Sequence, residues 1–234
     1  ALRELIKYAH DIGFLIVPHI CTCDAYNVSE DWNEADVAKY PDGSLSTHAV
    51  YGSGRMYNMC YKVAYEKNAQ KLHDALVDLG FRGILYNDVY SIVPPTVCCD
   101  PNHPVNSKEA QMWGYKTLED GAKKLGGVAS EGCYDHFASI LDYCLYSIFS
   151  DSYENVNVKP MRDAYIPLWH IVYNGTILSC PVSSCVNYTV KEPDVAMKQL
   201  EYGGHPTYYF YSAHRDDAAN WMGGRTKTGV SKDL

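Results

Sequence analysis

The chain has 234 residues, of which 47% are hydrophobic and 21% charged, values that fit a globular protein with a substantial core. The formal net charge of -8 argues against nucleic acid as a partner, because phosphate recognition depends on clustered Lys and Arg. No run of about 18 apolar residues is present, so no membrane-spanning segment is expected.

The first predicted element is a helix that ends at Gly13 and whose apolar face is formed by Leu2, Leu5, Ile6 and Ala9. The sequence starts without Met and directly inside this pattern, which indicates a segment of a longer protein. Any targeting signal would then lie outside it, and a cytoplasmic or a bacterial cell-surface or secreted location both stay open.

Residues 14–20 form a continuous apolar run that predicts a buried parallel strand. The polar stretch at about 27–53 is too long for a plain connection and predicts an elaborated loop over a site. A helix is predicted over 61–79, with Gly80 at its end and an apolar stripe formed by Tyr65, Ala69, Leu72, Leu76 and Leu79.

Residues 83–90 read as the next strand, which ends in polar groups. Asn106 and Glu109 have the spacing of a capping box and predict a helix that reaches Leu125. A short strand is expected at 127–131, directly after that helix.

The later part of the chain continues the same alternation. The apolar run 165–173 predicts a strand, and Pro193 predicts the start of a helix through Leu200. A last strand is expected over 206–211.

Alternating strands and helices predict a parallel sheet. No strand is followed by the Gly-x-Gly-x-x-Gly loop of dinucleotide-binding folds, and polar residues stand at the carboxyl ends of successive strands, where barrel enzymes place their chemistry. The expected fold is therefore an α/β (β/α)8 TIM-type barrel. Since a complete barrel needs about 250 residues, residues 1–234 are expected to form a single partial catalytic domain that carries the central and later βα units.

Asp88 and Glu131 each follow an apolar run at the end of a predicted strand, in consecutive βα units 43 residues apart. Two carboxylates at neighbouring strand ends can flank one glycosidic bond, one ionised and the other carrying a proton for the leaving oxygen. The spacing alone leaves a second interpretation open, in which the two carboxylates cap the following helices or bind an Arg.

The segment from Ile84 to Tyr90 resembles the nucleophile strand of the endo-α-N-acetylgalactosaminidase-like barrel glycosidases and their uncharacterised bacterial homologues. Ser130-Glu131 resembles the family's acid/base motif. Further similarities are found at 19–26, before these two motifs, and at 166–175 and 199–206, after them. All of these segments stand in the same order as in the family. One departure concerns the residues after Glu131, where the family usually has an aromatic side chain and this chain has Gly132.

The resemblance implies a retaining glycosidase for an α-linked, N-acetylgalactosamine-like or galactose-like sugar. Asp88 would be its nucleophile and Glu131 its acid/base. A carbohydrate is the expected partner, and neither a cofactor nor a metal is expected. Further substrate-binding residues are proposed at the same strand ends and loops, where loop stabilisation or core packing is an equal alternative for each: His19, Asp24, Tyr26, Asn87, Tyr90, Tyr134, His136, Trp169, His170 and Asn174. Other histidines (His48, His73 and His103) are expected at the surface.

Two alternatives belong to other functional classes. One is a carbohydrate-binding barrel without turnover, in which the two carboxylates would be buried in ion pairs. The other is a Cys/His metal protein built from Cys21, Cys23 and His19, with Cys98 or Cys99 as a further ligand. None of the nine cysteines has the Cys-x-x-Cys spacing of a zinc knuckle, so small buried thiols in a reducing compartment or an anaerobe are the expected state.

Overall fold

A computed structural model describes residues 1–51, 53–132, 134–145, 168–179, 200–201 and 203–204. It divides into two compact units, which lie within Ala1–Asp142 and Tyr143–Leu234 and are taken in turn. The predicted helix at 193–200, except its last residue, and the predicted strand at 206–211 lie outside the described residues. That 1–234 forms one partial barrel domain stays a prediction.

The first unit is built on three parallel strands, in the order β1 (His19–Ile20), β5 (Leu85–Asn87) and β6 (Val128–Ser130). β1 pairs with β5, and β5 pairs with β6 in the register that sets Tyr86 opposite Ala129. This arrangement confirms the predicted parallel sheet. Closure into a barrel stays a prediction.

β1 is much shorter than the strand predicted over 14–20. Only its last two residues pair, and Phe14, Leu15 and Val17 are exposed. Within the described residues β1 stands at the edge of its sheet, with β5 as its one partner. An apolar run of this kind is typical of a strand covered on both faces. Because Phe14, Leu15 and Val17 are exposed, the prediction that the whole run forms a strand is wrong.

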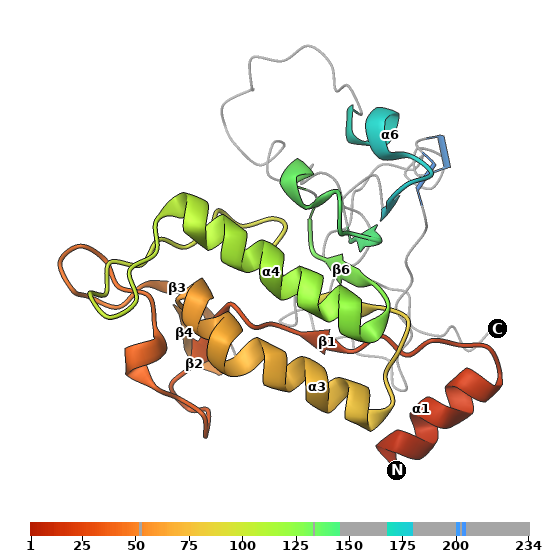
Figure 1. The fold of residues 1–234 in the computed structure, drawn as a ribbon, viewed down its shortest axis with the longest axis horizontal. Helices are drawn as coiled ribbons and strands as arrows, with labels where there is room; N and C mark the ends of the chain where they lie inside the picture. Colours follow the sequence, from red (N-terminus) through yellow and green to blue (C-terminus); the bar gives the residue numbers. More distant parts are fainter. Residues whose placement is uncertain (52, 133, 146–167, 180–199, 202, 205–234) are drawn as a thin grey trace, which may run out of the picture. The chain divides into compact units, whose positions relative to one another are not determined.

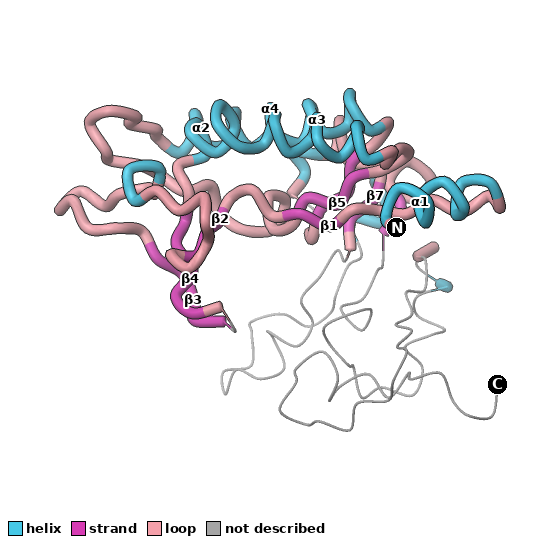
Figure 2. The backbone as a smooth tube through the Cα atoms, turned by 90° about the horizontal axis from the view of Figure 1, so that it is seen from below, coloured by secondary structure: helices cyan, strands magenta, loops and turns pink. Residues whose placement is uncertain are grey.

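Helices form a layer on one face of these strands, as Figures 1 and 2 show together. The predicted helix over 61–79 is present, in three consecutive pieces: α2 (Tyr61–Val63), the π-helical η2 (Ala64–Ala69) and α3 (Gln70–Leu79). Gly80 ends it at φ 101°, a left-handed conformation that glycine adopts without steric cost.

α4 (Ser107–Leu125) lies beside α3 in this layer. Its start confirms the predicted capping box, because the Asn106 side chain accepts from the Glu109 N–H at 3.0 Å and Glu109 accepts from the Asn106 N–H at 2.9 Å. These two bonds satisfy amide groups that the helix itself cannot pair.

α1 (Leu2–Asp11) also agrees with the sequence pattern, although only Ile6 and Ala9 of its apolar face are buried. Ile6 packs in a hydrophobic core with buried side chains from α3, the turn after it, β5 and α4: Leu76, Phe81, Leu85 and Leu125. This core helps to fix the position of β5, which pairs with β6.

The segment at 27–53 is more regular than the elaborated loop expected there. It contains η1 (Glu34–Asp36) and β3 (Thr47–Tyr51), which pairs antiparallel with β4 (Gly54–Asn58). β4 also pairs with β2 (Asp24–Tyr26), so the three strands form a small antiparallel sheet. In Figure 2, β3 and β4 lie away from the helical layer.

The second unit contains the parallel pair β7 (Tyr143–Cys144) and β8 (Leu178–Ser179), together with α6 (Leu168–Tyr173). The strand predicted over 165–173 is wrong for 168–173, which is helical. Leu168, Ile171 and Val172 are exposed there, and an apolar run of this length does not by itself distinguish strand from helix.

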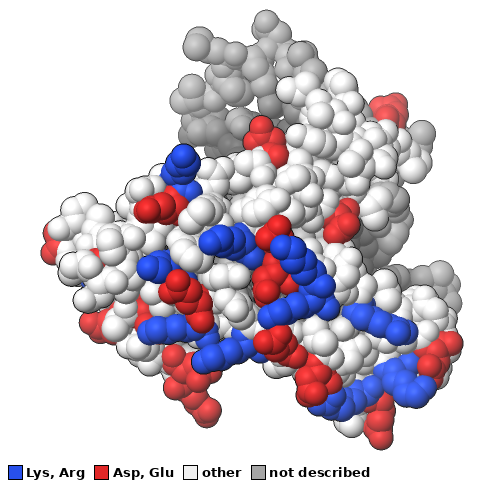
Figure 3. All heavy atoms as spheres, viewed as in Figure 1, with Lys and Arg blue, Asp and Glu red and all other residues white. Residues whose placement is uncertain are grey.

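Opposite charges alternate over the face that carries α3 and α4 (Figure 3). Lys124 pairs with Asp74 at 2.7 Å and with Asp120 at 3.2 Å, and Lys123 pairs with Glu119 at 2.9 Å. Among the helices that the structure describes, none is long and apolar enough to cross a membrane.

Candidate active site

Asp88 and Glu131 directly follow the carboxyl ends of two paired parallel strands, β5 and β6. Tyr86 stands opposite Ala129, and Asp88 and Glu131 each lie two residues beyond that pair. Neighbouring strands lie about 4.8 Å apart. The two predicted carboxylates therefore follow adjacent strand ends at the same edge of the sheet.

Both oxygens of the Asp88 carboxylate have a polar neighbour. The Tyr86 hydroxyl donates to Oδ1 at 2.8 Å, and His19 Nε2 lies 3.6 Å from Oδ2. The Asp88 N–H also donates to the Ile20 carbonyl at 2.8 Å, which ties the residue to β1. The carboxylate is held in position yet stays 27% exposed, so a ligand can reach it.

Asp88 and Glu131 both affect the pKa of His19. Its hydrogen-bonding interaction with Asp88 raises the pKa of the imidazole above the ordinary 6.5, against the opposing effect of burial, and the negative charges of Asp88 and Glu131 raise it further. The imidazole also packs edge-on against the Tyr86 ring, with 4.7 Å between centroids. His19 thus stands with Asp88 and Glu131 in one electrostatic neighbourhood.

Asp24 at the start of β2 belongs to the same neighbourhood. Burial raises the pKa of its carboxyl, a hydrogen bond from Cys21 lowers it, and the charge of Asp88 raises it again. Burial and the charge of Asp24 also raise the pKa of the Tyr26 phenol. The small antiparallel sheet therefore brings Asp24 toward Asp88, and Tyr26 toward Asp24.

The backbone is strained directly after Asp88. Val89 has φ 59°, the one described non-glycine residue with a positive φ. A β-branched residue rarely adopts this conformation, and such strain costs about 1–3 kcal/mol. The Tyr90 N–H donates to the Asp88 carbonyl at 2.8 Å, so the chain turns sharply at the candidate nucleophile.

Asn87 and Tyr90, both predicted to bind substrate, lie beneath this surface. Asn87 is fully buried and Tyr90 is 2% exposed. Thr22 joins them, since the Asn87 amide donates to its hydroxyl at 3.2 Å and that hydroxyl donates to the Tyr90 hydroxyl oxygen at 3.1 Å. These hydrogen bonds hold the residues beneath the strand ends, and their predicted contact with substrate stays a prediction.

Ser91 links the segments that follow β5 and β6. Its N–H donates to Ser130 Oγ at 3.3 Å, its hydroxyl donates to the Gly132 carbonyl at 2.7 Å, and the Gly132 N–H lies 3.1 Å from Ser91 Oγ. These bonds hold the residues on both sides of Glu131. Ser91 and Tyr86 had no signal in the sequence beyond their places in or next to a predicted strand end.

Tyr134 and His136 lie in the segment after Glu131 and stack on each other, with 5.6 Å between ring centroids. The Tyr134 N–H donates to the Ser91 carbonyl at 2.9 Å. His136 Nε2 is buried without a hydrogen-bond partner among the described residues, and burial lowers the pKa of its ring. Their predicted contact with substrate stays a prediction.

Trp169, His170 and Asn174 belong to the second unit. The Trp169 ring contacts Tyr173, with 4.3 Å between centroids, and its Nε1 is buried without a hydrogen-bond partner among the described residues. His170 is buried, whereas Asn174 is exposed and donates through its backbone N–H to the His170 carbonyl at 3.0 Å. A sugar contact for these three residues also stays a prediction.

Among the residues that the structure describes, two groups of side chains have metal-ligand chemistry. Cys21, Cys23 and Asp24 form one, with 3.5 Å between the two sulfurs. His19, which the metal hypothesis included, is not part of that group. The hydrogen bond with Cys23 and then burial raise the pKa of the Cys21 thiol well above its ordinary value, which favours a neutral thiol. The second group consists of Cys60, Cys98 and His103.

Solved structures similar to this chain include α-N-acetylgalactosaminidase NagBb from Bifidobacterium bifidum. Its Gal-NHAc-DNJ complex aligns with a TM-score of 0.76 at 22% identity, over 95% of this chain and 34% of that chain. Its GalNAc complex aligns with a TM-score of 0.75 at 20% identity, over 95% and 35%. The fold is shared with glycoside hydrolases. This agrees, at the level of the fold, with the resemblance noted in the sequence.

A second similar structure is TtGalA, an α-galactosidase from Thermus thermophilus in complex with stachyose, with a TM-score of 0.58 at 10% identity over 88% of this chain and 48% of that chain. The chain thus spans about a third of the length of NagBb and about half that of TtGalA. No protein-family model and no curated protein sequence matches it.

Proposed function

We propose that the protein is a retaining glycoside hydrolase for an α-linked N-acetylgalactosamine-like or galactose-like sugar, with Asp88 as nucleophile and Glu131 as acid/base. The observation that supports this proposal is the parallel pairing of β5 with β6, because Asp88 and Glu131 each lie two residues beyond the paired residues Tyr86 and Ala129. A strand spacing of about 4.8 Å suits the separation of about 5–5.5 Å that retaining enzymes need between their carboxyl groups.

In the first step Asp88 attacks the anomeric carbon, and a glycosyl-enzyme ester forms as the glycosidic bond breaks. Glu131 donates its proton to the leaving oxygen. The Tyr86 hydroxyl, 2.8 Å from Oδ1, orients the carboxylate. Oδ2, which lies 3.6 Å from His19, is less tightly bound and is the oxygen that we expect to attack.

In the second step Glu131 takes a proton from water, the resulting hydroxide attacks the same carbon from the opposite side to Asp88, and the ester bond breaks. Asp88 leaves as a carboxylate and Glu131 is again protonated. Two inversions give a product with the configuration of the substrate. We expect His19, Asp24 and Tyr26 to bind the sugar hydroxyls.

The sugar preference rests on similarity of fold. NagBb was solved with GalNAc and TtGalA with stachyose, and both are named for α-galactose-type substrates. These names support an α-linked galactose-type sugar here. An assay on N-acetylgalactosaminides and galactosides distinguishes an acetamido group from a hydroxyl at carbon 2 of the sugar.

The test is a panel of aryl α- and β-glycosides of N-acetylgalactosamine, galactose and glucose. Asp88→Asn and Glu131→Gln should each lower kcat on the best substrate by about 10³-fold or more, as loss of a catalytic carboxylate does. Asp31→Asn and Glu66→Gln, which change exposed acids, should keep wild-type rates. Wild-type turnover by Asp88→Asn would refute the nucleophile.

Azide separates the two roles. In Asp88→Ala azide takes the place of the nucleophile and should form a glycosyl azide of inverted configuration. In Glu131→Ala azide takes the place of the activated water and should form one of retained configuration. Inverted sugar as the wild-type product would exclude the retaining mechanism. Sugar binding without turnover on any substrate would favour the non-catalytic carbohydrate-binding barrel.

A further inference from the structure

Three buried side chains outside the candidate active site bring metal-ligand atoms together. Cys60, Cys98 and His103 place two sulfurs and a ring nitrogen within 4.8 Å of one another. Cys98 Sγ lies 3.3 Å from His103 Nδ1, and Cys60 Sγ lies 3.5 Å from the His103 carbonyl oxygen. All three residues are buried, with exposed fractions of 0%, 2% and 9%.

The other nitrogen of the His103 ring fixes the role of Nδ1. Nε2 lies 2.7 Å from the Ala35 carbonyl oxygen and 3.7 Å from Asp100 Oδ2, and both of these groups only accept hydrogen bonds. Nε2 therefore carries a proton, and in the neutral ring the lone pair on Nδ1 is free to face Cys98 Sγ, which lies 3.3 Å away. Metal-binding histidines commonly have this arrangement, with the second nitrogen donating to a backbone carbonyl or a carboxylate.

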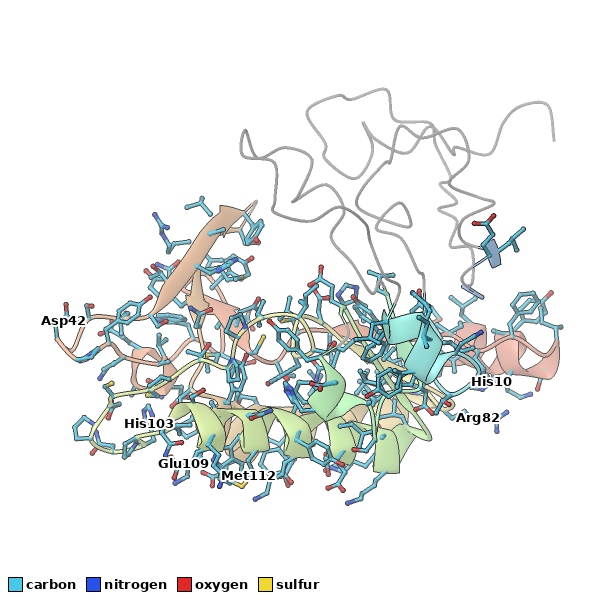
Figure 4. All side chains as sticks on the ribbon, turned by 90° about the horizontal axis from the view of Figure 1, so that it is seen from above. His10, Asp42, Arg82, His103, Glu109 and Met112 are labelled. Carbon is cyan, nitrogen blue, oxygen red and sulfur yellow. The ribbon has the colours of Figure 1, made fainter. Side chains whose placement is uncertain are left out.

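The backbone holds the ligands in place before any ion binds. Cys98 and Val105 exchange two backbone hydrogen bonds of 2.9 Å, which close the loop that carries His103. The Cys60 N–H donates to the Asp36 carbonyl at 3.0 Å, and Asp100 in the loop pairs with Lys39 at 2.6 Å. Figure 4 shows His103 near the start of α4. The cluster thus joins the start of α2 to the loop that leads into α4.

We propose that Cys60, Cys98 and His103 bind a zinc ion. At Zn–S and Zn–N distances of about 2.3 and 2.0 Å, tetrahedral ligand atoms stand about 3.5–3.8 Å apart, which the cluster reaches with small side-chain adjustments. Three protein ligands leave one coordination position for a water molecule or a small anion.

The chemistry of the donor atoms favours the same assignment. Two thiolates buried at this place without a cation would be unfavourable. A zinc ion supplies the positive charge. On binding, the two thiols release their protons to solvent and form Zn–S bonds, with no change of oxidation state. Soft sulfur and imidazole ligands favour zinc over magnesium or calcium.

The first measurement is zinc content by elemental analysis of protein purified under reducing conditions with zinc in the medium. We expect about one zinc ion per chain, and less than a tenth of that in Cys98→Ser and His103→Ala. Cys21→Ser and Cys23→Ser, in the other cysteine group, are the matched controls and should keep the ion. Wild-type protein without zinc, or zinc lost from the Cys21 and Cys23 variants instead, would overturn the proposal.

A second measurement does not depend on how well the variants fold. Wild-type protein stripped with a chelator is titrated with Co²⁺, which should give the absorption of a tetrahedral thiolate complex, and Zn²⁺ should abolish it. The chelator should also lower the Tm of wild-type protein and leave that of Cys98→Ser unchanged. The site would be contradicted if the stripped protein showed no cobalt absorption. A disulfide between Cys60 and Cys98 after purification under reducing conditions would also contradict it. Neither result bears on the glycosidase proposal.

Discussion

His19 and Asp88 are coupled through one ion pair, which makes the imidazole a reporter on the candidate nucleophile. Asp88 is the main cause of the raised pKa of His19, so Asp88→Asn should bring that pKa down toward the ordinary 6.5. NMR titration of the imidazole measures it, with Asp31→Asn as the unchanged control. An unaltered His19 pKa in Asp88→Asn would show that the pair is absent in solution.

Asp24 should make the protein less stable at neutral pH. The pKa of its carboxyl is raised in the folded state, chiefly by burial, so the folded protein holds that proton more tightly than the unfolded chain. The free energy of unfolding therefore falls as the pH rises from the ordinary pKa of 3.8 through the raised one.

Asp24→Asn removes this titration. In urea unfolding the variant should be more stable than wild type at pH 7, and the difference should shrink below the ordinary pKa of 3.8. Equal or lower stability of Asp24→Asn at pH 7 would show that ionised Asp24 is compensated by its neighbours. Activity should fall in the same variant if Asp24 binds the sugar.

Single residues were predicted well where local sequence decides their place. Asp88 follows a buried strand, and its position could be expected from the apolar run before it. His73 and His103 were predicted at the surface and are buried. His73 contacts Asp120 at 2.8 Å, a partner 47 residues away on α4, and no local pattern reveals such a pairing.

Among the elements, helices that begin at a capping box or end at a glycine were predicted best. α4 begins at a capping box and ends before Gly126, and both signals are visible in the sequence. α6 lacks such signals, and its apolar residues suggested a strand. The short pairing of β1 could not be predicted either, because the length of a strand depends on the partner that covers it.

α4 packs on β5 closely enough to require glycine at one position. A Cβ on Gly121 would lie 2.6 Å from Leu85 Cδ2, and Leu85 is fully buried. Gly121→Ala should therefore destabilise the protein by about 1–3 kcal/mol in denaturant unfolding, despite the better helix propensity of Ala. Met112→Ala, on the exposed side of α4, should change stability by at most about 0.5 kcal/mol. Equal effects of both would mean that α4 and β5 are less closely packed.

For the molecule as a whole, the sequence predicted the parallel sheet and the class of fold. The ordered motifs carried the expected family, which the similarity to NagBb supports at the level of the fold. The small antiparallel sheet and the Cys60, Cys98 and His103 cluster were not predicted. Both depend on pairings between distant segments, such as β2 with β4, that no short pattern encodes.

Ligand binding offers a test on the whole molecule. A ligand that binds only the folded state at about 100 times its Kd stabilises it by about 2.7 kcal/mol. An iminosugar of the type bound to NagBb should therefore raise the Tm of this protein, whereas a glucose-type iminosugar should not. A Tm unchanged by the galactose-type compound at saturating concentration would argue against the proposed sugar.

The π-helical segment Ala64–Ala69 has a consequence for how this chain tolerates changes of length. A π turn accommodates one residue more than an α turn, so it behaves like a single-residue insertion within a helix. Tyr61 before it and His73 after it are both buried, although uninterrupted α-helical periodicity would not align them. Deletion of one residue inside 64–69 should convert the segment to α-helix and keep both buried faces. The same deletion within α4, which has no such spare residue, would rotate half of that helix out of the core.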